Sequence, residues 1–177
     1  MAGTINISEV VTSFYSDLKT VAADLNAASD ELGKCIAEID DGLKTLNLGI
    51  TVWVEIDKWH GDFGGGDETY WSEEIGYSKW CGRWGICLRK TYGDAGAGEE
   101  TCEQWLFNEA PRALRLKGTD HLVTLLQKLN EEGIKTAEMI RAKTAEMQEV
   151  AGAITKAAFV PKKGRTAGVQ VRFEEAK

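Results

Sequence analysis

Few residues in this sequence carry the chemistry of catalysis. The chain has only two histidines, His60 and His121, and neither belongs to a motif that pairs a nucleophile with a base. We therefore predict that the protein is not an enzyme. The catalytic alternative is a chaperone-like or hydrolytic protein that uses His60 together with Asp57 or Asp62.

Signatures of metal and cofactor binding are also missing. The nearest approach to a ligand set lies downstream of His60, where a C-x5-C-x14-C spacing is formed by Cys81, Cys87 and Cys102. No CxxC or HxxxH pair supports it, so we expect no metal site. The glycine-rich loops GDFGGGDE and GDAGAGEE lack the P-loop and GxGxxG patterns, and their acidic residues repel phosphate. We expect no cofactor.

Aromatic residues are the best candidates for binding. All six tryptophans fall between Trp53 and Trp105, and tryptophan and arginine are enriched at interface hot spots. The candidate binding residues are Trp53, Trp59, His60, Trp80 and Arg83. Trp53 lies on the polar face of its predicted strand, while Trp80 and Arg83 border a trough of small residues. The alternatives are a small-molecule pocket around Trp53, Trp80 and Arg83, or rings that only fill a core.

Composition and charge narrow the class of protein. The 177 residues are 43% hydrophobic and 28% charged, which suits a folded globular protein. The net charge of −7 and the absence of a basic stripe argue against nucleic-acid binding. No apolar run approaches the ~20 residues of a membrane span, and no secretion signal begins the sequence. We expect a cytoplasmic protein with reduced cysteines and no membrane contact.

The first 47 residues predict a long coiled-coil helix. Twelve positions alternate in steps of four and three, and eleven of them are apolar: Ile7, Val11, Phe14, Leu18, Val21, Leu25, Ala28, Leu32, Cys35, Ile39, Gly42 and Leu46. We call this row the N-terminal seam. Beside it runs a flanking strip formed by Tyr15, Ala22, Ile36 and Leu43. Either the head folds over this strip or another subunit covers it; we favour the second, which makes the protein a homo-oligomer.

Residues 119–160 predict a second long helix, with Thr119 as its N-cap. Its own heptad row is the C-terminal seam: Leu122, Leu126, Leu129, Gly133, Ala137, Ile140, Thr144, Met147, Ala151, Ile154 and Ala158. The two helices flank the rest of the chain and have similar lengths, so we expect an antiparallel stalk within one chain. When paired residue numbers sum to 165, Phe14 meets Ala151 and Leu18 meets Met147. Several of these pairs, such as Phe14 with Ala151, set a large side chain against a small one.

Residues 48–118 predict a β-meander head between these helices. Residues 50–57 alternate, with Ile50, Val52, Val54 and Ile56 on one face and Thr51, Trp53, Glu55 and Asp57 on the other. The segment 71–91 predicts a hairpin that turns at Cys81-Gly82. Its register pairs Glu73 with Lys90, Glu74 with Arg89, Ile75 with Leu88 and Tyr77 with Ile86. A fourth strand is expected at 102–108, followed by a short helical turn at 110–116.

These patterns combine into an α+β protein, in which an antiparallel coiled-coil stalk carries a β-meander head. Residues 161–177 form a basic tail, which is expected to be frayed or to supply one short strand. The layout of two helices joined by β-hairpins is similar to that of prefoldin-type chaperones, although no particular residue carries this resemblance. We predict a non-enzymatic interaction or assembly module, whose head binds a protein partner.

Overall fold

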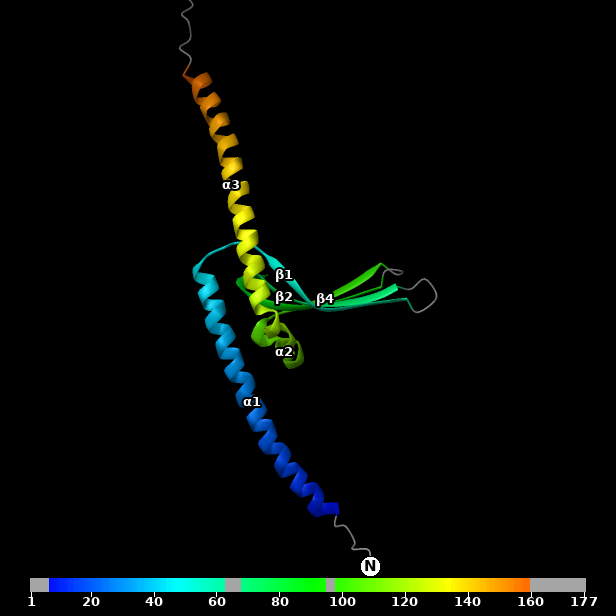
Figure 1. Ribbon diagram of the computed structural model, residues 1–177. Coiled ribbons are helices and arrows are strands. Elements are labelled where there is room, and N and C mark those ends of the chain that lie inside the picture. Colours follow the sequence, from blue (N-terminus) through cyan, green and yellow to red (C-terminus); the bar gives the residue numbers. More distant parts are fainter. Residues whose placement is uncertain (1–6, 63–67, 95–97, 160–177) are drawn as a thin grey trace, which may run out of the picture. The chain divides into compact units, whose positions relative to one another are not determined.

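The chain folds as an α+β protein in which a four-stranded antiparallel sheet lies between long helices in the sequence (Figure 1). The computed structural model describes residues 7–62, 68–94 and 98–159. The elements are α1 (Ile7–Thr45), β1 (Val52–Asp62), β2 (Glu68–Trp80), β3 (Arg83–Asp94), β4 (Glu99–Leu106), η1 (Phe107–Glu109), α2 (Arg112–Asp120) and α3 (Leu122–Ala158). The chain divides into two units, Met1–Lys135 and Thr136–Lys177, and all sites below except the C-terminal seam lie in the first. The predicted basic tail lies outside the described residues.

The sheet has the strand order β1-β2-β3-β4, with each strand antiparallel to the next. The predicted β2–β3 hairpin is confirmed pair by pair: Glu73 faces Lys90, Glu74 faces Arg89, Ile75 faces Leu88, and Tyr77 faces Ile86. Cys81 and Gly82 both have positive φ, 47° and 82°, as a two-residue turn between twisted strands requires. Local charge and apolar pairing therefore fixed this register correctly.

Strand β1 departs from the predicted alternation. A β-bulge between Glu55 and Asp57 shifts its pairing with β2, so Asp57 lies on the same face as Val54 rather than opposite it. The prediction that Asp57 joins the outer face is therefore wrong, because a bulge adds one residue to the alternation. Asp57 instead binds Lys117 of α2, with an Nζ–Oδ2 distance of 3.0 Å.

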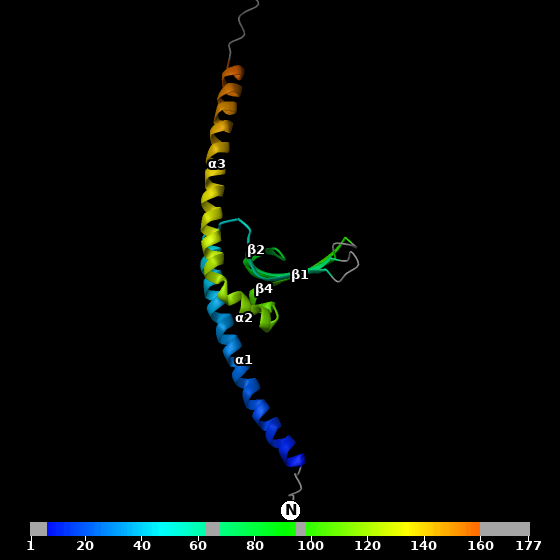
Figure 2. The same ribbon diagram turned by 45° about the vertical axis from the view of Figure 1, so that its right-hand side comes forward.

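The hydrophobic core lies between one face of the sheet and the helices. It contains Ile36, Leu43, Val52, Val54, Ile75, Tyr77, Ile86, Leu88, Phe107, Ala110, Leu114, Leu125 and Leu129. The end of the sheet that carries the β2–β3 turn lies near α1, and the other end extends away from it (Figures 1 and 2). Only part of the sheet is therefore covered by helices.

The second long helix begins later than predicted. Thr119 lies in the last turn of α2, where its hydroxyl donates a hydrogen bond to the Arg115 carbonyl oxygen at 2.8 Å. The prediction that Thr119 caps the long helix is wrong, because a separate short helix precedes it. His121 stands between the two helices, and its N–H bonds to the carbonyl oxygen of Gly118 at 3.1 Å.

The sheet unit covers the C-terminal half of the flanking strip. Ile36 and Leu43 are buried in the core, while Tyr15 stays 64% exposed. The expectation that another subunit covers the whole strip is therefore wrong for its second half. The predicted coiled-coil stalk is not confirmed, because seam side chains such as Phe14 on α1 and Ile154 on α3 are solvent-exposed.

Candidate functional site

The five candidate binding residues do not form one site, and Trp53 belongs to the packing of the sheet. Its ring lies over Gly76, and the Arg89 guanidinium stands 4.0 Å from the ring centroid. Arg89 also forms an ion pair with Glu74 across the hairpin. Trp53 is therefore half-buried rather than exposed, and it fills part of the predicted trough.

The rest of that trough is also filled. Cys87 is fully buried, and the Ser78 hydroxyl accepts a hydrogen bond from Gln104 Nε2 at 3.1 Å. Burial raises the pKa of the Cys87 thiol, which keeps it protonated and unreactive. Trp80 lies at the end of β2, where it pairs with Arg83 and is half-buried. A ligand therefore has no open trough on this face of the sheet.

Trp59 stands in a row of aromatic residues across three strands. The sheet register places Trp59 of β1 opposite Trp71 of β2, and Trp71 opposite Tyr92 of β3. We call these three residues the aromatic row. Trp59 is 40% exposed and Tyr92 is 43% exposed. The row shares its face with the core but lies nearer the far end of the sheet.

A charged cluster separates the aromatic row from the core. The Glu73 carboxylate binds Lys90 Nζ at 3.0 Å and Lys117 Nζ at 2.8 Å. Burial alone would raise the pKa of Glu73, but the two lysine hydrogen bonds outweigh it and lower this pKa. Lys90 Nζ also lies 5.5 Å from the ring centroid of Trp71 and 5.0 Å from that of Tyr92. The row is thus bordered by cations held in place by a carboxylate.

His60 lies on the other face of the sheet. It stacks on Tyr70 with ring centroids 6.3 Å apart, and the Tyr70 hydroxyl donates a 2.6 Å hydrogen bond to Glu100. That hydrogen bond raises the pKa of Tyr70. Asp57, one proposed partner of His60 in hydrolysis, points to the opposite face toward Lys117. The side chain of the other, Asp62, lies outside the described residues. The arrangement offers no His60–Asp57 pair for catalysis.

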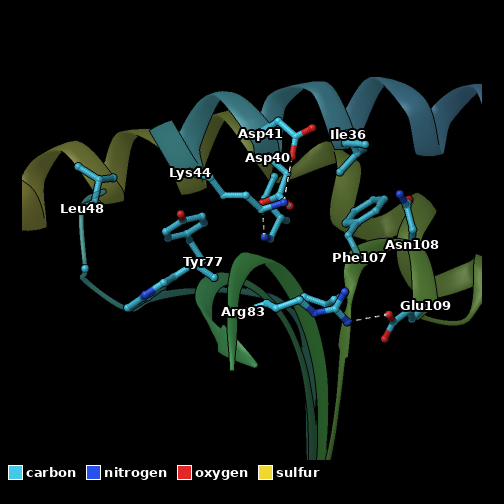
Figure 3. Close-up of a pocket in the computed structure, with 15 residues that line it drawn as sticks. Ile36, Asp40, Asp41, Lys44, Leu48, Tyr77, Arg83, Phe107, Asn108 and Glu109 are labelled. Atoms are coloured by element: carbon cyan, nitrogen blue, oxygen red, sulfur yellow. Dashed lines mark hydrogen bonds and ion pairs between the residues drawn. The ribbon is translucent and has the colours of Figure 1, made fainter. Parts of the chain in front are cut away.

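Arg83 borders a cavity between the C-terminal part of α1, the β2–β3 hairpin and η1 (Figure 3). We call it the helix–hairpin cavity; its volume is about 570 Å³. Asp40 of α1 anchors its roof, since Oδ1 accepts the Ile86 N–H at 2.8 Å and Oδ2 binds Lys44 Nζ at 2.8 Å. The Arg83 guanidinium lies 3.6 Å from the Glu109 carboxylate at the opposite rim.

Sequence reasoning missed several residues of these two sites. The pairing of Trp71 with Tyr92 could have been predicted. Extending the hairpin register from Glu73–Lys90 to the next pair on the same face brings these two residues opposite each other. The position of Trp59 could not have been predicted, since the bulge in β1 decides which face it takes. Asp40 and Tyr77 line the same cavity only because α1 packs against the hairpin. No local sequence pattern predicts that packing.

The described residues form neither a metal-binding cluster nor a membrane-spanning helix. Residues 7–62, 68–94 and 98–159 contain no group of three or more histidine, cysteine, aspartate or glutamate side chains placed to hold a metal ion. Within the same ranges, no helix is long and apolar enough to cross a membrane. The chain matches no protein-family model, no curated protein and no solved structure.

Proposed function

We propose that this protein is a non-enzymatic assembly module, whose helices associate with those of a second copy and whose β head binds a protein partner. One observation carries the proposal: an unbroken apolar seam on α1 that is left open to solvent. The six seam residues from Ile7 to Leu25 are between 48% and 75% exposed. A contiguous apolar patch of this kind marks an interaction surface.

The regular spacing of the seam specifies what covers it. Steps of four and three place these side chains along one stripe of the helix, where the knobs of a second helix fit between them. The C-terminal seam has the same spacing apart from one doubled step of four around Gly133, and in its second half Ile140, Met147 and Ile154 are each more than half exposed. Each copy therefore carries two exposed seam segments that a coiled coil would bury.

An antiparallel pairing suits these two seams. The predicted register sets Leu18 against Met147, and it is the same whether the two helices belong to one chain or to two. Because the first half of the N-terminal seam and the second half of the C-terminal seam are exposed, we propose that the partner helix comes from a second copy. The four cysteines are free, which agrees with assembly in the reducing cytoplasm.

The aromatic row is the surface that the head offers to a partner. Its exposed rings resemble the anchors of binding hot spots, and Lys90 and Lys117 supply charge beside them. Glu73 neutralises part of that charge. With exposed rings and little net positive charge, the aromatic row suits a partner protein that offers apolar side chains and a few carboxylates. It suits a strongly charged polymer less well.

A single lysine in the N-terminal seam tests assembly. Leu18→Lys places a charge among apolar side chains, so we expect the oligomer to dissociate in sedimentation-velocity experiments on the full chain. Ser16→Lys adds the same charge to an exposed, off-seam position and should leave the oligomer intact. Equal sedimentation of both variants would argue against the seam as the interface.

Capture from a lysate of the cells that make the protein tests the head. Wild type should retain a specific protein that the Trp59→Ala/Tyr92→Ala double variant loses, because the exposed rings of the row are removed. Trp53→Ala, on the other face of the sheet, serves as the control and should retain it. If the double variant captures the same proteins as wild type, the row is not the contact surface.

A further inference from the structure

The helix–hairpin cavity has the size and walls of a small-molecule site. Its volume of about 570 Å³ falls inside the range of roughly 300–1,000 Å³ that such sites occupy. Most of its lining is apolar or aromatic and comes from Ile36, Leu48, Tyr77, Trp84, Ile86, Leu106 and Phe107. Figure 3 shows Tyr77 and Phe107 on opposite sides of the space beneath α1. A flat ring suits this lining better than a flexible chain does, because aromatic rings stack and the Trp84 ring of the lining is only half-buried.

Tyr77 places a polar group on the wall of this apolar space. The residue is only 1% exposed, and its ring stacks on Trp84 with centroids 5.6 Å apart. Figure 3 shows its hydroxyl directed toward α1. From the wall of the cavity, this O–H can donate a hydrogen bond to an acceptor on a bound molecule.

The charges at the rim restrict the charge of that molecule. The lining holds three carboxylates, those of Asp40, Asp41 and Glu109, against the two cations of Lys44 and Arg83. Lys44 already binds Asp40 and Asp41 at 2.8 and 3.0 Å, and Arg83 lies 3.6 Å from Glu109. An anion would therefore meet a net negative rim whose cations are already paired.

We propose that the helix–hairpin cavity binds a small, uncharged aromatic molecule that accepts a hydrogen bond from the Tyr77 hydroxyl. The ring packs on the half-buried apolar side chains of the wall, Leu48, Trp84 and Leu106, and α1 forms the roof. This site is separate from the seams and from the aromatic row. Binding of a ligand there therefore does not depend on assembly. The elements that enclose it meet only in the folded unit, and a bound ligand would stabilise their contact.

Binding of 1-naphthol to the full chain, measured by isothermal titration calorimetry, tests the site. Ala37 lines the cavity from α1, and Ala37→Trp fills it, so we expect affinity to fall by at least about tenfold. Ala23→Trp adds the same ring at the equivalent position two heptads earlier, on an exposed surface, and should not change the affinity. Equal affinity of wild type and Ala37→Trp, or no binding to wild type, would overturn the proposal.

Two further comparisons test the chemistry of recognition. Tyr77→Phe keeps the ring and removes the hydroxyl, so 1-naphthol should bind about 3- to 10-fold more weakly. This variant also covers the case in which Ala37→Trp fails to fold, which circular dichroism would reveal. The anion 1-naphthoate should bind wild type more weakly than 1-naphthol does. Unchanged affinity in Tyr77→Phe, or tighter binding of the anion, would contradict the proposed ligand class.

Discussion

Glu73 marks the point on the sheet where the covered core gives way to the open aromatic row. It is only 7% exposed, and it is held by Lys90 of the neighbouring strand and Lys117 of α2. A buried carboxylate is tolerated when it is paired and hydrogen-bonded, and both conditions are met here. The cluster therefore fixes α2 on the sheet and holds both lysines beside the rings.

The pKa shifts of this cluster give a stability that depends on pH. The lowered pKa of Glu73 contributes stability above the ordinary carboxyl range, and this contribution is lost as the pH falls through the folded-state pKa. The hydrogen bonds that Lys90 donates to Tyr92 and Glu73 raise its pKa, and those that Lys117 donates to Glu73 and Asp57 raise the pKa of Lys117. The lysine contribution is present below their unfolded pKa and is lost as the pH rises through the folded value.

Glu73→Gln removes the acidic part of this dependence. We expect the free energy of unfolding at neutral pH to fall by about 1–3 kcal/mol, because two charge-assisted hydrogen bonds lose their anion. Stability should also decline less than in wild type between about pH 5 and pH 3, where an unfolded glutamate titrates. Urea titrations followed by tryptophan fluorescence measure both effects, with the exposed Glu131→Gln as control. A variant as stable and as acid-sensitive as wild type would exclude this role.

At the scale of single residues, the sequence predicted only half of this cluster. Glu73 and Lys90 were paired correctly, because they face each other within one hairpin. Lys117 was not connected to them, since its place depends on how α2 lies on the sheet. Contacts between neighbouring strands can be predicted from alternation and charge, whereas contacts between distant elements need the packed structure.

Among the elements, the hairpin was the most predictable and the α2–α3 junction the least. Four pairs of matching residues supported the β2–β3 register, and a positive-φ turn closes the hairpin. Thr119 had the residue type of an N-cap, but the backbone there was already helical. A capping residue indicates where a helix can begin, and tertiary packing decides whether it does.

The packing of α2 on the sheet depends on Gly118. A Cβ built there would lie 2.8 Å from Leu88 Cδ2, in the fully buried part of the core. Gly118→Ala should therefore destabilise the protein by about 1–3 kcal/mol in urea unfolding. Gly42→Ala in α1 is the control: nothing lies within 4 Å of its Cβ, so better helix propensity should stabilise it by up to about 1 kcal/mol. If Gly118→Ala were more stable than wild type, α2 would pack on the sheet more loosely than the 2.8 Å distance to Leu88 indicates.

For the whole molecule, the heptad pattern predicted the long first helix but not what covers each side of it. Ile36 and Leu43 pack into the core, and the seam residues Leu32 and Ile39 pack against it, while the seam from Ile7 to Leu25 is exposed. Both rows are apolar in sequence, so the pattern alone cannot tell which part of each is buried. The exposed part of the seam is the surface that we propose for assembly.

The central claim is that these exposed seams join two or more copies. The most direct test is the molar mass of the full wild-type chain, measured by light scattering over a wide range of protein concentration. One chain has a mass of 19.4 kDa. We predict a whole-number multiple of that mass, which decreases toward the monomer only on dilution. A mass of one chain at every concentration would contradict the account.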